Sequence, residues 1–361
     1  MAQIPRSRLT PGFYRDERSR VVGASLVAGI LLLLLGSDAK AQLKGHYVPG
    51  FTGLQSGTQP PPAISVFLPL YFYTTNDIRD DNGERLGAQP RINATFIGPG
   101  VLWVTNAKIL GGNLGGSVVP IAFIKSRIEG ASLDVPGSFA FTDIFVQPIQ
   151  LGWEKTRADF VVGYSLFIPT GKWEQGGDDN AGLGMWSHDL QAGTTLHLDN
   201  KHQWTFSALT TYEIHSEKKD SDIKVGDILT IEGGLGKSFD KFEMAGATPV
   251  PALVTNVGLV YYGQYKLTSD KASVITPLLA GRKDRVFGAG VEGNVILVKS
   301  GLVFGLRVEP EFGARNRTQG WTFLFSAAYQ LKSLVKAHEP VAPESRNAVV
   351  RQVRRPVEPG T

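Results

Sequence analysis

The chain has 361 residues, a formal net charge of +4 and no cysteine. The lack of cysteine excludes a disulfide scaffold and a thiolate metal site, and the diffuse charge offers no patch suited to nucleic acid. Glycine is abundant at 42 residues and charged residues make up only 19% of the chain, a balance that a membrane barrel shares because its strands mix lipid-facing and lumen-facing residues.

The first 41 residues have the features of an export signal. Arginines precede an apolar run over 21–35, which is short for a membrane helix, and Ala39-Lys40-Ala41 has the small-x-small form of a cleavage site. We therefore expect a signal peptide over 1–41, with a retained signal anchor as the alternative.

Residues 42–61 form a segment rich in glycine and proline. It contains the run Gly45-His46-Tyr47-Val48-Pro49-Gly50 and leads into Pro60-Pro61-Pro62, so neither a strand nor a helix is expected. If the runs that follow form a membrane barrel, this segment either hangs free in the periplasm or folds into the lumen of the barrel as a plug. In the second case His46 and Tyr47 are the candidate plug contacts, since such side chains are unusual in a purely solvated leader.

Runs with period-two alternation begin at Ala63. About twelve are expected, with boundaries uncertain by about two to four residues. They lie near 63–75, 94–107, 117–128, 140–150, 158–168, 186–198, 203–215, 227–238, 252–267, 285–298, 301–312 and 320–331.

The late runs show what each face of a strand meets. In the run over 301–312, large apolar side chains alternate with Arg307, Glu309 and Glu311. A face with three charged residues cannot point into hydrocarbon, so it is expected to line a lumen.

The lengths of the connections between the runs provide an independent test of a membrane barrel against a soluble sandwich. Those after odd-numbered runs are mostly long and polar, and those after even-numbered runs are mostly short, which is the rhythm of an outer-membrane barrel with both termini in the periplasm and is not required of a soluble sandwich. The long ones are 76–91, 169–185, 216–226 and 268–284, and the short ones are 152–157, 199–202 and 299–300. The connection over 239–251 is longer than the rule predicts.

The pattern as a whole predicts an all-β protein: a transmembrane antiparallel up-and-down β-barrel of about 12 strands over residues 62–332. The tail over 333–361 loses the alternation and is rich in proline and charge, so a disordered periplasmic extension is expected.

The sequence contains no complete motif for catalysis, phosphate binding or metal binding. The run Gly233-Gly234-Leu235-Gly236-Lys237-Ser238 lacks the first glycine of a phosphate-binding loop, because Ile231 occupies that position. Ser187 and His188 are neighbours on a strand and face opposite ways, so they cannot share a proton. No metal-ligand spacing is found, and no catalytic, cofactor-binding or metal residue is assigned.

Several ordered motifs resemble one family. They are the run over 45–50 with Pro60-Pro61-Pro62, Leu151-Gly152-Trp153, Pro169-Thr170-Gly171, Tyr212-Glu213 and Glu232-Gly233-Gly234. Together they are similar to the outer-membrane proteins associated with the meta-pathway of phenol degradation. The resemblance implies a bacterial outer-membrane β-barrel that transports aromatic or other hydrophobic compounds, and it supplies no catalytic residues.

Three functional hypotheses follow. The first is a passive channel for small hydrophobic or aromatic molecules, because a barrel of about twelve strands encloses a narrow lumen. Its candidate lining residues are Glu213, Gln264, Glu292, Arg307, Glu309 and Glu311, and ordinary salt-bridging inside the lumen is the alternative role for each. The second is a lipid-modifying enzyme with a site at the outer rim, and the third is a sealed structural or adhesive barrel.

Overall fold

The computed structural model describes residues 44–87, 90–130, 133–175, 177, 180–245, 248–272 and 283–335. The expected signal peptide and nearly all of the expected tail lie outside these residues. In the described part of the chain, no helix is long and apolar enough to cross a membrane.

Twelve antiparallel strands form the wall, and some are divided into shorter elements. In ring order they are β1 (Ala63–Thr75), β3 (Arg91–Ile97) with β4 (Gly100–Ile109), β5 (Gly112–Val119) with β6 (Ala122–Gly130), β7 (Leu133–Gly137) and β8 (Ala140–Phe141) with β9 (Ile144–Glu154), β10 (Ala158–Ile168), β11 (Ser187–His197), β12 (Trp204–His215), β13 (Ile228–Ala245), β14 (Thr248–Lys266), β15 (Arg285–Leu297), β16 (Leu302–Arg315) and β18 (Trp321–Ser333). A separate two-stranded sheet joins β2 (Ile78–Arg79) to β17 (Arg317–Thr318).

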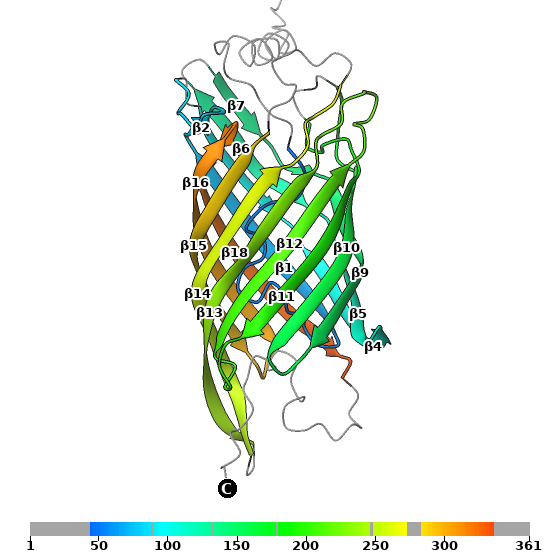
Figure 1. Cartoon of the computed structure of the whole chain (residues 1–361), viewed down its shortest axis with the longest axis vertical. Helices are drawn as coiled ribbons and strands as arrows, with labels where there is room; N and C mark the ends of the chain where they lie inside the picture. Colours follow the sequence, from blue (N-terminus) through cyan, green and yellow to red (C-terminus); the bar gives the residue numbers. More distant parts are fainter. Residues whose placement is uncertain are drawn as a thin grey trace, which may run out of the picture. The chain divides into compact units, whose positions relative to one another are not determined.

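The sheet closes on itself, as Figure 1 shows. The last strand β18 pairs with the first strand β1 from Ala63 opposite Ser333 to Thr74 opposite Trp321. Closure matters because an open edge would leave backbone donors and acceptors unpaired in lipid. The prediction of an antiparallel barrel of about twelve strands is confirmed.

The two faces of the wall differ in polarity as the alternation predicts. Leu306, Val291 and Leu190 point outward and are 58%, 57% and 52% exposed, whereas Glu309 and Glu232 point inward and are fully buried. Apolar side chains on the outside of a closed sheet are stable only against lipid.

The connections define two ends of the barrel. The loop end carries the connections 76–90, 169–186 and 216–227, and the turn end carries the connections 155–157 and 198–203. Strand β1 starts at the turn end, so the residues before Ala63 enter the barrel wall from there.

Two expected strands are interrupted by proline. The expected runs 94–107 and 117–128 are each split, at Pro99 between β3 and β4 and at Pro120 between β5 and β6. Proline has no backbone donor, so it breaks the ladder locally. On the loop-end side of the breaks β3 pairs with β6, and on the turn-end side β4 pairs with β5.

The expected connection over 239–251 is instead a hairpin of strand, and the prediction there was wrong. β13 and β14 pair continuously to Ala245 opposite Thr248, whereas β12 and β15 stop pairing with them near Lys237 and Leu253. Figure 1 shows the resulting ribbon extending past the turn end. Pro249 and Pro251 lie within this part of β14, where prolines are tolerated because the strand has a free edge.

Candidate functional site

The segment before β1 runs through the lumen from the loop end to the turn end. His46 contacts Ser187, which begins β11 at the loop end, and Thr58 contacts Asp159, near the start of β10 at the turn end. In Figure 1 this segment is the blue coil inside the ring of strands. Glycine and proline deny it a regular structure, so its polar groups depend on partners from the wall.

His46 is held on every side. One ring nitrogen, Nδ1, lies 2.6 Å from the Ser187 hydroxyl, the other, Nε2, lies 2.7 Å from Asp143 Oδ2, and its backbone N–H donates to Glu213 at 2.6 Å. The imidazole also stacks on Phe167, with 4.7 Å between ring centroids. This residue joins the segment to four parts of the wall at once.

Asp143 is the charged partner of His46 at the loop end. Burial opposes its ionisation, but hydrogen bonds from His46 and from the backbone N–H groups of Leu183 and Gly171 outweigh burial and lower the pKa of Asp143. The carboxylate therefore stays charged next to the imidazole.

Glu232 of β13 is the main acceptor for the middle of the segment. It accepts from the Tyr47 hydroxyl at 2.5 Å, from the Gly50 N–H at 2.7 Å, and from both the N–H and the hydroxyl of Thr52 at 3.0 and 2.5 Å. Four donors from one short stretch converge on this single carboxylate.

Arg307 of β16 binds the backbone carbonyls of the same stretch, between Gly50 and Thr52. Its guanidinium pairs with Glu292 through Nε at 3.0 Å and Nη2 at 2.7 Å, and Nη1 donates to the Gly50 and Thr52 carbonyls. Glu292 also accepts from the Leu54 N–H at 3.1 Å. A planar fork suits this task because it serves a carboxylate and two carbonyls together.

The half of the segment nearer the turn end, called the lower half below, packs closely against the wall. Its turn carries a hydrogen bond from the Thr58 N–H to the Gln55 carbonyl at 2.9 Å, and Ser207 donates to the Gly53 carbonyl at 3.0 Å. At Gly57 a Cβ would lie 2.0 Å from the Thr194 carbonyl carbon. Only glycine fits there, because that obstacle is strand backbone.

Gly57→Ala is expected to release the lower half of the segment. Overpacking against an immovable neighbour costs about 1–3 kcal/mol, which raises the released population roughly 5- to 150-fold. The protein has no cysteine, so a Ser56→Cys background reports release as the rate of labelling by an aqueous thiol reagent. Gly87→Ala is the matched control, since a Cβ at Gly87 meets nothing within 4 Å. Equal labelling rates in the two variants would show that Gly57 does not hold the segment.

Most of the lining residues that the sequence predicted come together around the segment. Glu213, Glu292 and Arg307 contact it directly, and Gln264 donates to the Tyr47 carbonyl at 3.1 Å. Glu309 is fully buried with Arg307 at 4.0 Å.

Glu311 lies away from the segment's hydrogen bonds. It accepts from the hydroxyls of Tyr73 and Tyr262 at 2.8 and 3.0 Å and from the Gly320 N–H at 2.7 Å, all from the wall near the loop end. The hydrogen bonds of Glu311 therefore join neighbouring parts of the wall.

Several contact residues were missed by sequence reasoning. Glu232, Asp143, Ser187, Asp159 and Ser207 all bind the segment. The sequence did contain a signal for Glu232, because it alternates with the apolar residues Ile231 and Leu235 and so belongs to the opposite, lumen-facing side. In the structure Ile231 and Leu235 are 37% and 38% exposed on the lipid face. The serines carry no such signal, since a small hydroxyl is common on either face.

The enzyme hypothesis required a histidine near a hydroxyl and a carboxylate at the outer, lipid-facing rim. His46 meets the distance condition with Ser187 and Asp143, but these groups face the lumen and the Ser187 side chain is fully buried. A substrate lipid at the rim has no access to this hydroxyl. The arrangement holds the segment in place.

Comparison with known proteins agrees with this architecture. The model of a family described as the MetA-pathway of phenol degradation matches residues 75–327. The chain belongs to this family. A search of curated protein sequences returned no match.

Among solved structures, outer-membrane proteins match the fold of this protein. The COG4313 outer membrane channel from Pseudomonas putida F1 matches with a TM-score of 0.61 and 13% identity, over 79% of this chain and 99% of that chain. The toluene transporter TodX of Pseudomonas putida matches with a TM-score of 0.33 and 12% identity, over 81% of this chain and 96% of that chain. At that score TodX bears little on the present fold. The protein is thus an outer-membrane β-barrel.

Proposed function

We propose that the protein is a passive outer-membrane channel for small hydrophobic or aromatic molecules. The observation that carries this proposal is the segment over 44–62, which is hydrogen-bonded to strands from β9 to β16 across the lumen of a closed barrel. A wide aqueous path for polar nutrients does not fit a lumen occupied in this way. Family membership and the fold support the same class of function.

The lumen surface suits an uncharged aromatic cargo. The rings of Phe167, Tyr71 and Tyr262 are no more than 5% exposed; Phe167 stacks on His46 of the segment and Tyr71 stacks on Phe96, so a cargo meets these rings only where the segment moves aside. Aromatic rings favour stacked or edge contacts with an aromatic cargo. Two of the charged pairs around the segment, His46 with Asp143 and Arg307 with Glu292, are internal to the lumen, so a neutral cargo does not compete for these charges.

The candidate lining residues then divide into two groups. Glu213, Glu292 and Arg307, together with His46 and Tyr47, set how firmly the segment is held. Gln264 also donates to the Tyr47 carbonyl and belongs with them, whereas Glu309 and Glu311 make no hydrogen bond to the described residues of the segment and shape the lumen around it. The first group governs the rate of passage and the second governs which molecules enter.

Liposome uptake tests the proposal. Vesicles that contain the purified protein are expected to take up phenol or toluate faster than a sugar of similar size, after subtraction of the rate for protein-free vesicles. Equal protein-dependent rates for the aromatic and the sugar would overturn the proposed preference. Absence of uptake for both would favour the sealed structural barrel, because the same segment would then close the lumen permanently.

A further inference from the structure

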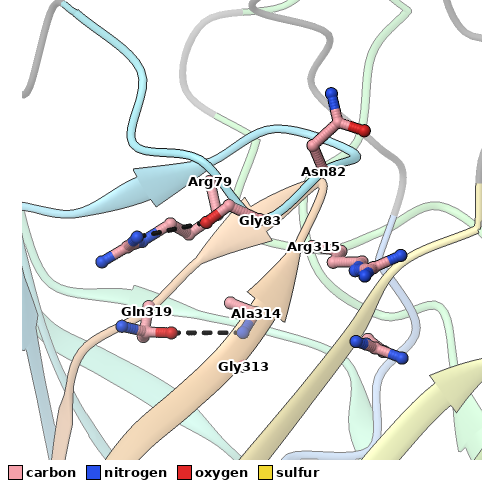
Figure 2. A pocket seen from close by; sticks show the side chains of 8 residues that line it. Arg79, Asn82, Gly83, Gly313, Ala314, Arg315 and Gln319 are labelled. Atoms are coloured by element: carbon pink, nitrogen blue, oxygen red, sulfur yellow. Dashed lines mark hydrogen bonds between the residues drawn. The ribbon is translucent and has the colours of Figure 1, made fainter.

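The outer rim of the barrel carries a small cavity that the channel function does not use. It has a volume of about 340 Å³ and lies between the first long loop and the ends of β15 and β16. Figure 2 shows its wall, with Asn82 and Gly83 on the loop and Ala314 and Arg315 on β16. Arg79, Arg285 and Arg315 line it, and among the described residues that line it there is no carboxylate.

Two of these arginines are direct cross-strand partners. Arg285 at the start of β15 pairs with Arg315 at the end of β16. Like charges directly opposite one another in an antiparallel pair are destabilising. An anion bound between them would remove that repulsion.

The protein supplies this pair with no counter-ion in its described part. The neighbouring carboxylate of Asp284 lies 3.8 Å from Lys266 and 3.7 Å from Arg317, on the lumen side. The adjoining stretch 273–282 contains no aspartate or glutamate in its sequence. Arg285 Nε is buried without a hydrogen-bond partner among the described residues.

Arg79 differs from this pair. Its Nη2 lies 2.6 Å from Asp77, and its Nη1 donates to the Gly83 carbonyl at 3.1 Å. Figure 2 shows the guanidinium groups of Arg79 and Arg315 directed to opposite sides of the cavity. The uncompensated charge therefore belongs to Arg285 and Arg315.

The pair stands at the level of the lipid headgroups. Phe287 and Phe312, the next paired residues toward the membrane centre, stack with 5.7 Å between ring centroids, and Phe312 is 52% exposed on the outer face. The Arg285 guanidinium lies 5.7 Å from the centre of the Phe287 ring. Aromatic rings mark the interface of a membrane barrel, so charges just beyond them meet headgroups.

We propose that Arg285 and Arg315 bind the phosphate group of a lipid in the outer leaflet. Two guanidinium forks match the several oxygens and the double charge of a phosphate. Basic pockets at the membrane surface are a known means of recognising anionic headgroups. The inference goes beyond transport and rests on the placement of the barrel in the outer membrane with its long loops outside the cell.

Native mass spectrometry of the full-length protein in neutral detergent tests the proposal. Titration with bis-phosphorylated lipid A and with its dephosphorylated form is expected to show at least about tenfold tighter binding of the phosphorylated lipid. This comparison uses the wild-type protein, so it does not depend on the folding of any variant. Equal binding of the two lipids would overturn the proposal.

Variants then locate the site. R285Q/R315Q is expected to lose the preference for the phosphorylated lipid. The control K125Q/K219Q removes the same charge from exposed loop-end positions outside the cavity and is expected to retain the preference. Retention of the preference by R285Q/R315Q would place the phosphate elsewhere and overturn the proposal.

A third arm separates the sources of phosphate. Inorganic phosphate is expected to displace the lipid from the wild-type protein only at concentrations far above those of the lipid, because the acyl chains add contacts beside Phe312. If inorganic phosphate binds as tightly as the lipid, the pocket takes a free anion and the lipid assignment is wrong.

Discussion

Deletion of residues 44–58 is expected to turn the barrel into an open pore. The segment fills the lumen but donates nothing to the strand ladder, since the ring closes from Ala63 onward between β1 and β18. Its removal should leave the wall folded and vacate the space between Asp143 at one end and Asp159 at the other. In planar bilayers we expect steady conductance at least about tenfold above that of the full-length protein, because ions then pass through water instead of packed protein.

The deletion should also abolish selectivity. Sugar uptake into liposomes is expected to rise to about the rate for phenol, because the obstacle to polar molecules is gone. Heat-dependent mobility on gels, a property of intact barrels, checks that the variant has folded. A folded deletion variant with the conductance of the full-length protein would mean that residues 44–58 do not obstruct the lumen.

Glu232→Ala is expected to have the second-largest effect. The variant removes the acceptor of four hydrogen bonds from the segment and leaves the buried Tyr47 hydroxyl without its partner. Hydrogen bonds to charged groups contribute about 1.5–3 kcal/mol each, and partial relaxation reduces their sum. A loss of several kcal/mol raises the released population by on the order of a hundredfold or more.

The effect of Glu232→Ala is measured as labelling of Ser56→Cys and as conductance. Glu311→Ala is the matched control, because this carboxylate is also inward-facing but binds Tyr73, Tyr262 and Gly320 of the wall. We expect the control to lower the thermal stability of the barrel without raising the labelling rate. Similar labelling in both variants would show that Glu232 has no special hold on the segment.

The strands were predictable because their signal is local. Alternation with period two needs only neighbouring residues, so the expected runs 63–75 and 158–168 coincide with β1 and β10. The predictions failed at two kinds of place. Pro99 and Pro120 break strands that the alternation had joined, and the expected connection over 239–251 is a hairpin of β13 and β14.

The direction in which side chains point is also encoded locally. A charged face such as that of Arg307 and Glu309 has to avoid hydrocarbon, so the alternation alone identifies the lumen side of β16. The alternation likewise places Glu232 on the lumen side of β13, although Glu232 was not among the predicted lining residues.

The amino-acid sequence by itself determined a membrane barrel with a polar interior, because each strand carries its own two-faced pattern. Only the tertiary structure decided what occupies that interior. The segment over 44–62 has no periodicity, and its partners Asp143 and Glu232 lie 97 and 185 residues away from His46 and Tyr47. Closure of the ring brings these residues together, and the pairing of Arg285 with Arg315 likewise depends on the register of two strands. Contacts of this kind follow from geometry that no local pattern encodes.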